Sequence, residues 1–280
     1  MEQKREPSPY DPLCSLPRVD FVGEGLHYLP RVQYGMDHPR QYMECIYKDG
    51  LTNRPVVVWI HGGGWTDEYL TTTYRPERCV ADLAQAGFFI ACIEYRLARH
   101  APFPACVDDC QMAIAYLREN ADRFGIDPNR IAVWGESAGA HIAAMAALNY
   151  NDRADAPVQA AVLWYCPADF TLSLAGKDSA DDSSVAKLLG CKPSENPEAV
   201  RRISPVSYVK PGGTAAFLLM HGDADMLVDY DQSVRFEKLL EDAGYDSRLI
   251  TVPGQGHGFF EGQKYYDDIV KFLQEKIGQA

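Results

Sequence analysis

Val133-Trp134-Gly135-Glu136-Ser137-Ala138-Gly139-Ala140 is the stretch that decides how this chain folds. The β-type run 130–134 leads into it, and the helix-forming run 140–147 follows at once. A strand, a tight turn with a serine at its tip, and a helix are the context in which Gly-x-Ser-x-Gly indicates a nucleophile elbow. The serine should have a positive φ, and both glycines should be required because a Cβ there would strike the neighbouring strand or helix.

The same order of strand and helix recurs on both sides of this stretch. Continuous apolar runs predict parallel strands buried on both faces, whereas the weak alternation over 25–48 suits antiparallel strands at a sheet edge. The predicted buried strands are 56–60, 88–93, 131–134, 160–165 and 217–220, followed by 247–252, and the predicted helices are 76–86, 105–123, 138–149, 230–243 and 263–277. This alternation predicts a mostly parallel central sheet with helices on both faces.

The domain organisation follows from the absence of an internal repeat or a second apolar core, so we expect residues 1–280 to form a single domain. Residues 1–24 are proline-rich and are expected to form an irregular arm. Residues 170–213 contain no strand-like run. A loop of that length is usually functional or mobile, so this insertion could be a lid over a site or a surface excursion packed on the body.

The overall charge narrows the range of partners. A net charge of −12 repels phosphates, which argues against nucleic acid and against an anionic membrane surface. No apolar run approaches a membrane span, and the charged N-terminus lacks the apolar centre of a secretory signal, so a cytoplasmic location is expected.

The eight cysteines are scattered along the chain. Cys106 and Cys110 lack further ligands at metal-binding spacing, and we expect no metal site.

A serine nucleophile needs a base, and the base needs an orienting carboxylate. His257 follows the last predicted strand and lies between glycines, which makes it the candidate base for Ser137. Asp225 is the candidate carboxylate, because Asp223 is better placed to cap a turn and Asp229 to cap the next helix. The chain order serine, aspartate, histidine is the order found in α/β-hydrolases.

Acyl transfer also requires hydrogen-bond donors for the developing oxyanion. Three consecutive glycines after the first central strand would let backbone N–H groups converge, and we expect Gly63, Gly64 and Ala138 to form this oxyanion hole. A phosphate-binding loop is excluded because Trp65, rather than a Lys-Ser/Thr pair, follows the glycines. Glu136 is expected to be solvated or structural, without a catalytic role.

Three separated motifs carry a family resemblance: His61-Gly62-Gly63-Gly64-Trp65, Glu94-Tyr95-Arg96-Leu97-Ala98 with the later Pro102-Phe103-Pro104-Ala105, and Gly135-Glu136-Ser137-Ala138-Gly139. Over residues 55–262 the chain resembles the hormone-sensitive-lipase-like esterases of the α/β-hydrolase superfamily. The resemblance implies an α/β-hydrolase fold, ester hydrolysis by a Ser-His-Asp triad, and no cofactor.

The chain also departs from that family. Glu94 stands where the family commonly has Asp, and Arg99 and Met226 stand where it has Pro. A short, proline-rich start replaces the helical cap of many members. In this respect the chain is also similar to compact esterases related to acetyl-xylan and feruloyl esterases and to kynurenine formamidase.

The sequence therefore predicts a serine carboxylesterase that acts on a small-molecule ester through an acyl-enzyme. The expected substrates are short-chain or aryl esters, including acetylated or feruloylated carbohydrates. Trp65 and Phe259, with Tyr69, Tyr74 and Phe260, are candidates for the substrate pocket. An arylformamidase or amidase with the same triad is the main alternative, and a non-catalytic ligand-binding receptor is another. The oligomeric state is left open, a homodimer being one alternative.

Overall fold

The computed structural model describes residues 25–66, 77–172, 183–258 and 263–278. The predicted N-terminal arm and the pocket candidates Tyr69, Tyr74, Phe259 and Phe260 lie outside these residues.

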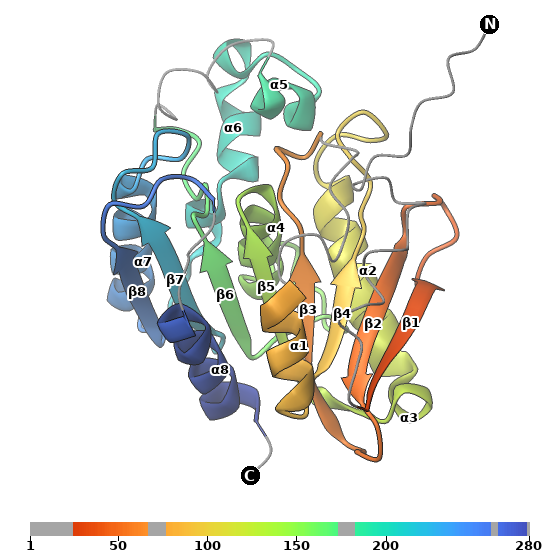
Figure 1. Cartoon of the computed structure of the whole chain (residues 1–280). Helices are drawn as coiled ribbons and strands as arrows, with labels where there is room; N and C mark the ends of the chain where they lie inside the picture. The colour runs from red at the N-terminus through yellow and green to blue at the C-terminus, as the bar shows by residue number, and fades with distance from the viewer. Residues whose placement is uncertain (1–24, 67–76, 173–182, 259–262, 279–280) are drawn as a thin grey trace, which may run out of the picture.

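The described chain is built on one eight-stranded sheet with the order β1-β2-β4-β3-β5-β6-β7-β8 (Figure 1). The pairs β1–β2 and β2–β4 are antiparallel, and all later neighbours are parallel. The strands are β1 (Leu26–Gln33), β2 (Tyr42–Lys48), β3 (Arg54–Ile60), β4 (Phe89–Ile93), β5 (Ile126–Glu136), β6 (Ala160–Trp164), β7 (Ala216–Gly222) and β8 (Ser247–Val252). This is the predicted sheet, including its antiparallel edge.

Helices cover both faces of the sheet. They are α1 (Glu77–Gln85), α2 (Ala105–Glu119), α3 (Ala121–Phe124), α4 (Ala138–Ala147), α5 (Ser184–Leu189), α6 (Pro197–Ile203), α7 (Asp231–Asp242) and α8 (Gln263–Ile277), with short 3₁₀ turns at Pro193–Glu195 and Pro205–Tyr208. Residues of α1 and α8 share one apolar core with Trp59 and Trp134, and both helices lie on the near face in Figure 1. Residues of α2, α4 and α7 belong to the core of the opposite face.

The central strands form where predicted because their side chains are buried on both faces. Every residue of β3, β4, β6 and β7 is buried, which suits continuous apolar runs; Arg54 at the start of β3 and His221 near the end of β7 are buried polar residues. The predicted helix 105–123 is divided in two: Asn120 is the C-cap of α2 and the N-cap of α3.

The insertion 170–213 is helical where it is described. Ser183 accepts a hydrogen bond from Ala186 N–H to cap α5, and Asn196 accepts one from Ala199 N–H to cap α6. Leu188 and Ile203 bury their side chains in the main core. The helices α5 and α6 lie beyond the carboxyl ends of the central strands (Figure 1). The described part of the insertion is therefore packed on the body, and its function as a lid stays a prediction.

No helix in the described ranges is both long and apolar enough to cross a bilayer.

Candidate active site

Ser137 lies on the predicted sharp turn between β5 and α4. Its backbone has φ 51° and ψ −117°, a strained conformation that costs about 1–3 kcal/mol and persists only where the surroundings enforce it. A Cβ on Gly135 would lie 2.3 Å from the backbone of Gly139, and a Cβ on Gly139 would lie 2.1 Å from the Ile60 carbonyl oxygen. Both glycines are thus required by close backbone approach, as the sequence predicted.

The structure brings the three predicted side chains into one line. The Oγ atom of Ser137 lies 3.1 Å from His257 Nε2, and His257 Nδ1 lies 2.7 Å from Asp225 Oδ2. Because Nδ1 faces a carboxylate, it carries the proton, and Nε2 is left to accept the serine hydroxyl. The His257 side chain is 18% exposed and that of Asp225 is fully buried. This geometry suits a serine with a general base.

The carboxylate of Asp225 is fully hydrogen-bonded. Its Oδ1 accepts the backbone N–H groups of Leu227 and Val228 at 2.8 and 3.0 Å, and its Oδ2 faces His257 and His221 at 2.7 and 3.1 Å. Burial by itself raises the pKa of Asp225, but the hydrogen bonds from the two histidines and from Val228 outweigh it and hold that pKa well below its usual range. Asp225 is therefore ionised at neutral pH.

The two rival aspartates have other contacts. Asp223 Oδ1 accepts the N–H of Gly254 at 2.6 Å, and Asp229 Oδ1 accepts the N–H of Asp231, the first residue of α7, at 3.0 Å. Asp223 thus holds the loop after β8 rather than a local turn. Asp229 contacts the start of α7, but the N-cap of that helix is Tyr230, so the predicted N-cap at Asp229 is wrong.

The glycine-rich loop after β3 turns in a way that few side chains allow. Gly63 has φ 100°, Gly64 has φ 57° and Trp65 has φ 58°. The next residue of the elbow, Ala138, begins α4, so its N–H has no partner within the helix. Within the described residues, the N–H groups of Gly63, Gly64 and Ala138 donate to no other protein group. They are available as donors; their use by an oxyanion stays a prediction.

Trp65 is anchored by His141, a histidine that is not among the predicted site residues. The Trp65 indole N–H donates to His141 Nδ1 at 3.2 Å, and His141 Nε2 lies 2.7 Å from the Ile203 carbonyl oxygen. Burial lowers the pKa of His141 to about 4, although the hydrogen bond to Ile203 opposes the shift. A neutral His141 thus ties together the glycine-rich loop, α4 and α6. Trp65 is only 4% exposed, and its contact with a substrate stays a prediction.

Glu136 is buried, so of the two predicted alternatives, solvated or structural, the structural one remains. It is 3% exposed, its Oε2 accepts the Tyr165 hydroxyl at 2.7 Å, and its Oε1 lies 3.4 Å from the N–H of Gly62. The Tyr165 ring in turn lies 4.4 Å from that of His257, centroid to centroid. Glu136 and Tyr165 therefore link the glycine-rich loop to the face of the histidine, a contact between β5 and β6 that linear spacing does not indicate.

Glu94, one of the departures from the family pattern, is buried and paired with an arginine. Its side chain is fully buried and forms an ion pair with Arg40, and its Oε2 lies 3.5 Å from His61 Nε2. The His61 ring stacks on Tyr95. A buried carboxylate requires such compensation.

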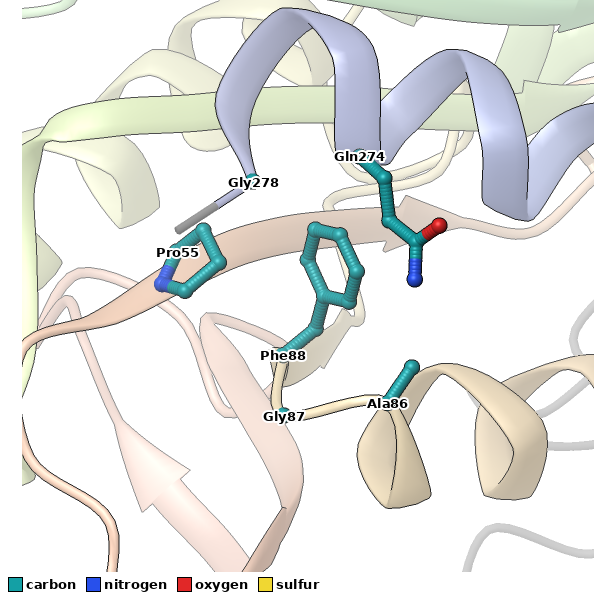
Figure 2. Close-up of a pocket in the computed structure, with 6 residues that line it drawn as sticks. All are labelled: Pro55, Ala86, Gly87, Phe88, Gln274 and Gly278. Atoms are coloured by element: carbon teal, nitrogen blue, oxygen red, sulfur yellow. The ribbon is translucent and has the colours of Figure 1, made fainter. Parts of the chain in front are cut away.

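The pocket in Figure 2 is at the other end of the sheet. It has a volume of about 280 Å³ and is lined by Pro55, Ala86, Gly87, Phe88, Gln274 and Gly278. These residues belong to the start of β3, the turn before β4 and the end of α8. None of them is titratable, and Ser137 lies at the opposite, carboxyl end of the parallel strands.

Among the described residues no three His, Cys, Asp or Glu side chains gather as a metal site.

A mostly parallel eight-stranded sheet with a serine on a strained strand-to-helix turn, and with aspartate and histidine following in that order, defines the α/β-hydrolase fold class. The chain can be compared with known members of that class.

The family model described as BD-FAE matches residues 46–240. Carboxylesterase NlhH of Mycobacterium tuberculosis is 32% identical over 79% of this chain and 70% of its own length. Esterase LipQ of the same organism is 32% identical over 73% of this chain. The chain belongs to the BD-FAE family, and these relatives are named as esterases. It spans only about half the length of LipQ.

Solved structures agree on the fold. A truncated carbohydrate esterase from gut microbiota is 27% identical and superposes with a TM-score of 0.80, covering 90% of this chain and 97% of the other. An esterase from Thermogutta terrifontis, at 23% identity and a TM-score of 0.71, is similar in fold.

Proposed function

We propose that this chain is a serine carboxylesterase that hydrolyses short acyl esters of carbohydrates through a Ser137–His257–Asp225 triad. The observation that carries the proposal is the line of hydrogen bonds from Ser137 Oγ to His257 Nε2 at 3.1 Å and from His257 Nδ1 to Asp225 Oδ2 at 2.7 Å. The strained backbone of Ser137 supports it, because such strain concentrates at active sites.

In the proposed reaction, His257 Nε2 takes the hydroxyl proton as Ser137 Oγ attacks the acyl carbon. The oxyanion that forms accepts the N–H groups of Gly63, Gly64 and Ala138. The protonated His257 then donates its proton to the departing alcohol, which leaves an acyl-serine. Water attacks this ester with His257 again as base, and the acid is released.

Asp225 remains ionised throughout the proposed cycle. Its low pKa means that it does not take the proton from His257. It holds the imidazole in the Nδ1–H tautomer and stabilises the cation that forms twice in each turnover. The amount of stabilisation depends on how many other donors share the same carboxylate.

The carbohydrate part of the proposal has separate support. The solved structure with a TM-score of 0.80 is that of a carbohydrate esterase. The helices described in the insertion are short: α5 has six residues and α6 has seven. Such a cap leaves more room for a bulky alcohol than a large helical cap would, and it favours a short acyl group on a sugar.

The experiment is a panel of substrates at equal active-site concentration. It compares p-nitrophenyl acetate, butyrate and octanoate, then acetyl-xylan and methyl ferulate, and finally N-formylkynurenine. We expect the highest kcat/KM among p-nitrophenyl esters for acetate, together with release of acetate from acetyl-xylan. Ser137→Ala is the matched control and should abolish each activity.

Three results would change the proposal. A preference for octanoate with no action on acetyl-xylan would remove the carbohydrate assignment and keep the esterase. Faster hydrolysis of N-formylkynurenine than of any ester would indicate a formamidase. Equal turnover by Ser137→Ala and the unchanged enzyme would refute the triad itself.

A further inference from the structure

The carboxylate of Asp225 is shared by two histidines. His257 Nδ1 and His221 Nε2 both face its Oδ2 atom, at 2.7 and 3.1 Å. His221 lies near the end of β7 and is fully buried. A buried histidine on the orienting carboxylate of the proposed triad is a group that the reaction itself does not use.

The contacts of His221 determine where its proton lies. Nε2 faces two acceptors, Asp225 Oδ2 at 3.1 Å and the Val228 carbonyl oxygen at 3.0 Å. A lone pair directed at two oxygens would be repelled, so Nε2 carries the hydrogen. Nδ1 lies 2.7 Å from Ser233 Oγ, and in the neutral ring it accepts the hydroxyl of Ser233. His221 is thus held as the Nε2–H tautomer from both sides.

The groups around this pair of histidines are few. The centroid of the Tyr165 ring lies 4.4 Å from that of His257 and 6.5 Å from that of His221. The Tyr165 hydroxyl donates a hydrogen bond to Glu136. From the start of α7, the Tyr230 ring lies 5.7 Å from His221, and its hydroxyl contacts Thr251. Among the described residues, the charged groups that face this cluster are the carboxylates of Asp225 and Glu136.

We propose that His221 is a positioning residue: as a neutral Nε2–H donor it holds Asp225 against Val228 and limits how strongly that carboxylate binds the catalytic imidazole. This rests on the proposed function, since it assigns His221 to the same triad. Oδ2 divides its accepting capacity between two N–H groups, and each donor weakens it as an acceptor for the other. His221 thereby sets the pH at which His257 becomes available as a base.

The test is the pH dependence of kcat/KM for p-nitrophenyl acetate in His221→Phe and His221→Gln. Phe keeps a ring against Tyr165 and Tyr230 but donates nothing, so Asp225 stabilises the protonated His257 more strongly. We expect the acid limb of the His221→Phe profile to move to higher pH by about half a unit or more. His221→Gln, whose amide can donate to the same oxygens, should return the limb to its original position.

His27→Phe, on the edge strand β1, makes the same chemical change far from the site and should leave the profile unchanged. A purely structural role for His221 would lower the yield or kcat without moving the limb. A limb that stays in place in a folded, fluorophosphonate-reactive His221→Phe enzyme would overturn the proposal. Labelling of Ser137 by the fluorophosphonate distinguishes the two failures. If the proposed function itself were wrong, Ser137 would not be labelled.

A measurement on the unchanged protein decides the case if the Phe variant does not fold. Nitrogen-15 NMR of histidine-labelled enzyme reports which ring nitrogen is protonated. We expect His221 to remain protonated at Nε2 and unprotonated at Nδ1 across the pH range of activity. An Nδ1–H tautomer, or a doubly protonated ring within that range, would overturn the proposal.

Discussion

The two ends of the central sheet differ in chemistry. The amino end of the parallel strands carries a cavity of about 280 Å³ whose lining has no titratable side chain. The carboxyl end carries Glu136, His221 and the Asp225 carboxylate, all buried. It also carries the positive φ angles of Trp65, Ser137 and Tyr165.

This difference indicates which end can do chemistry. A buried charge and a strained backbone each cost free energy, and they persist only where the rest of the fold holds them. The amino end holds a buried charge of another kind: the guanidinium of Arg54, at the start of β3, donates to main-chain carbonyl oxygens. The strained turn of Ser137, together with the hydrogen-bonded carboxylate of Asp225, therefore distinguishes the carboxyl end as the candidate site.

Of the substitutions that test the difference between the two ends of the sheet, replacement of Ser137 should have the largest effect. Ser137→Ala should lower kcat for p-nitrophenyl acetate by about 10⁶, on the scale of other triads, because no nucleophile remains at the carboxyl end. Initial rates over long incubation would measure it, with circular dichroism to show that the fold is kept. Residual turnover within tenfold of the unchanged enzyme would contradict the assignment.

The carboxylate should have the next largest effect. Asp225→Asn places an amide among four N–H donors, and its own NH₂ group then faces His257, which favours the wrong tautomer of the imidazole. A loss of about 10⁴ in kcat is expected. Asp223→Asn is the matched control at an exposed site and should keep activity within a few-fold. Equal losses in the two variants would refute the role of Asp225.

The free energy of unfolding should depend on pH through His141, which is buried at the carboxyl end of the sheet. Its pKa in the folded chain, about 4, lies below the ordinary value of 6.5, so the unfolded chain binds a proton that the folded chain does not. Its contribution is fully present above about pH 6.5 and is lost as the pH falls toward 4. Each pKa unit is worth about 1.4 kcal/mol, which makes the loss about 3 kcal/mol.

Urea unfolding from pH 7.5 to pH 4 measures this effect. His141→Gln should be less stable than the unchanged protein at pH 7.5, and its free energy of unfolding should fall less with pH, by about 3 kcal/mol over the range. Parallel pH curves for the two proteins would show that His141 is not held neutral by burial.

A substitution at the amino end of the sheet should have the smallest effect on activity and stability. Gln274→Ala enlarges the cavity in Figure 2, and we expect kcat/KM to remain within about twofold and the free energy of unfolding to change by about 0.5 kcal/mol or less. Steady-state kinetics and urea unfolding test both. A tenfold loss of kcat/KM would show that the two ends are functionally coupled.

Much of the fold and of the candidate site could be predicted because their signals are local. The buried strands are continuous apolar runs, and the elbow is specified by five adjacent residues around Ser137. Asp225 and His257 could be selected because each follows a predicted strand. Their mutual distances are known only from the structure.

The parts that could not be predicted depend on contacts across the sheet. His221 meets Asp225 and Ser233 through a turn and a helix start, and Tyr165 meets Glu136 only because β5 and β6 are neighbours. The helices α5 and α6 were also missed. Both helices are short and lie in a polar segment, with caps at Ser183 and Asn196. Such a segment is predicted to be a loop unless the residues that its apolar side chains pack against are known.

The central claim is that Ser137 is an activated nucleophile, and covalent labelling tests it most directly. The enzyme would be treated with a fluorophosphonate, digested and mapped by peptide mass spectrometry while activity is followed in parallel. We predict one adduct per chain, on Ser137, with activity lost in proportion to labelling and no adduct in Ser137→Ala. Complete inactivation with the adduct on another residue, or full activity with Ser137 labelled, would contradict the account.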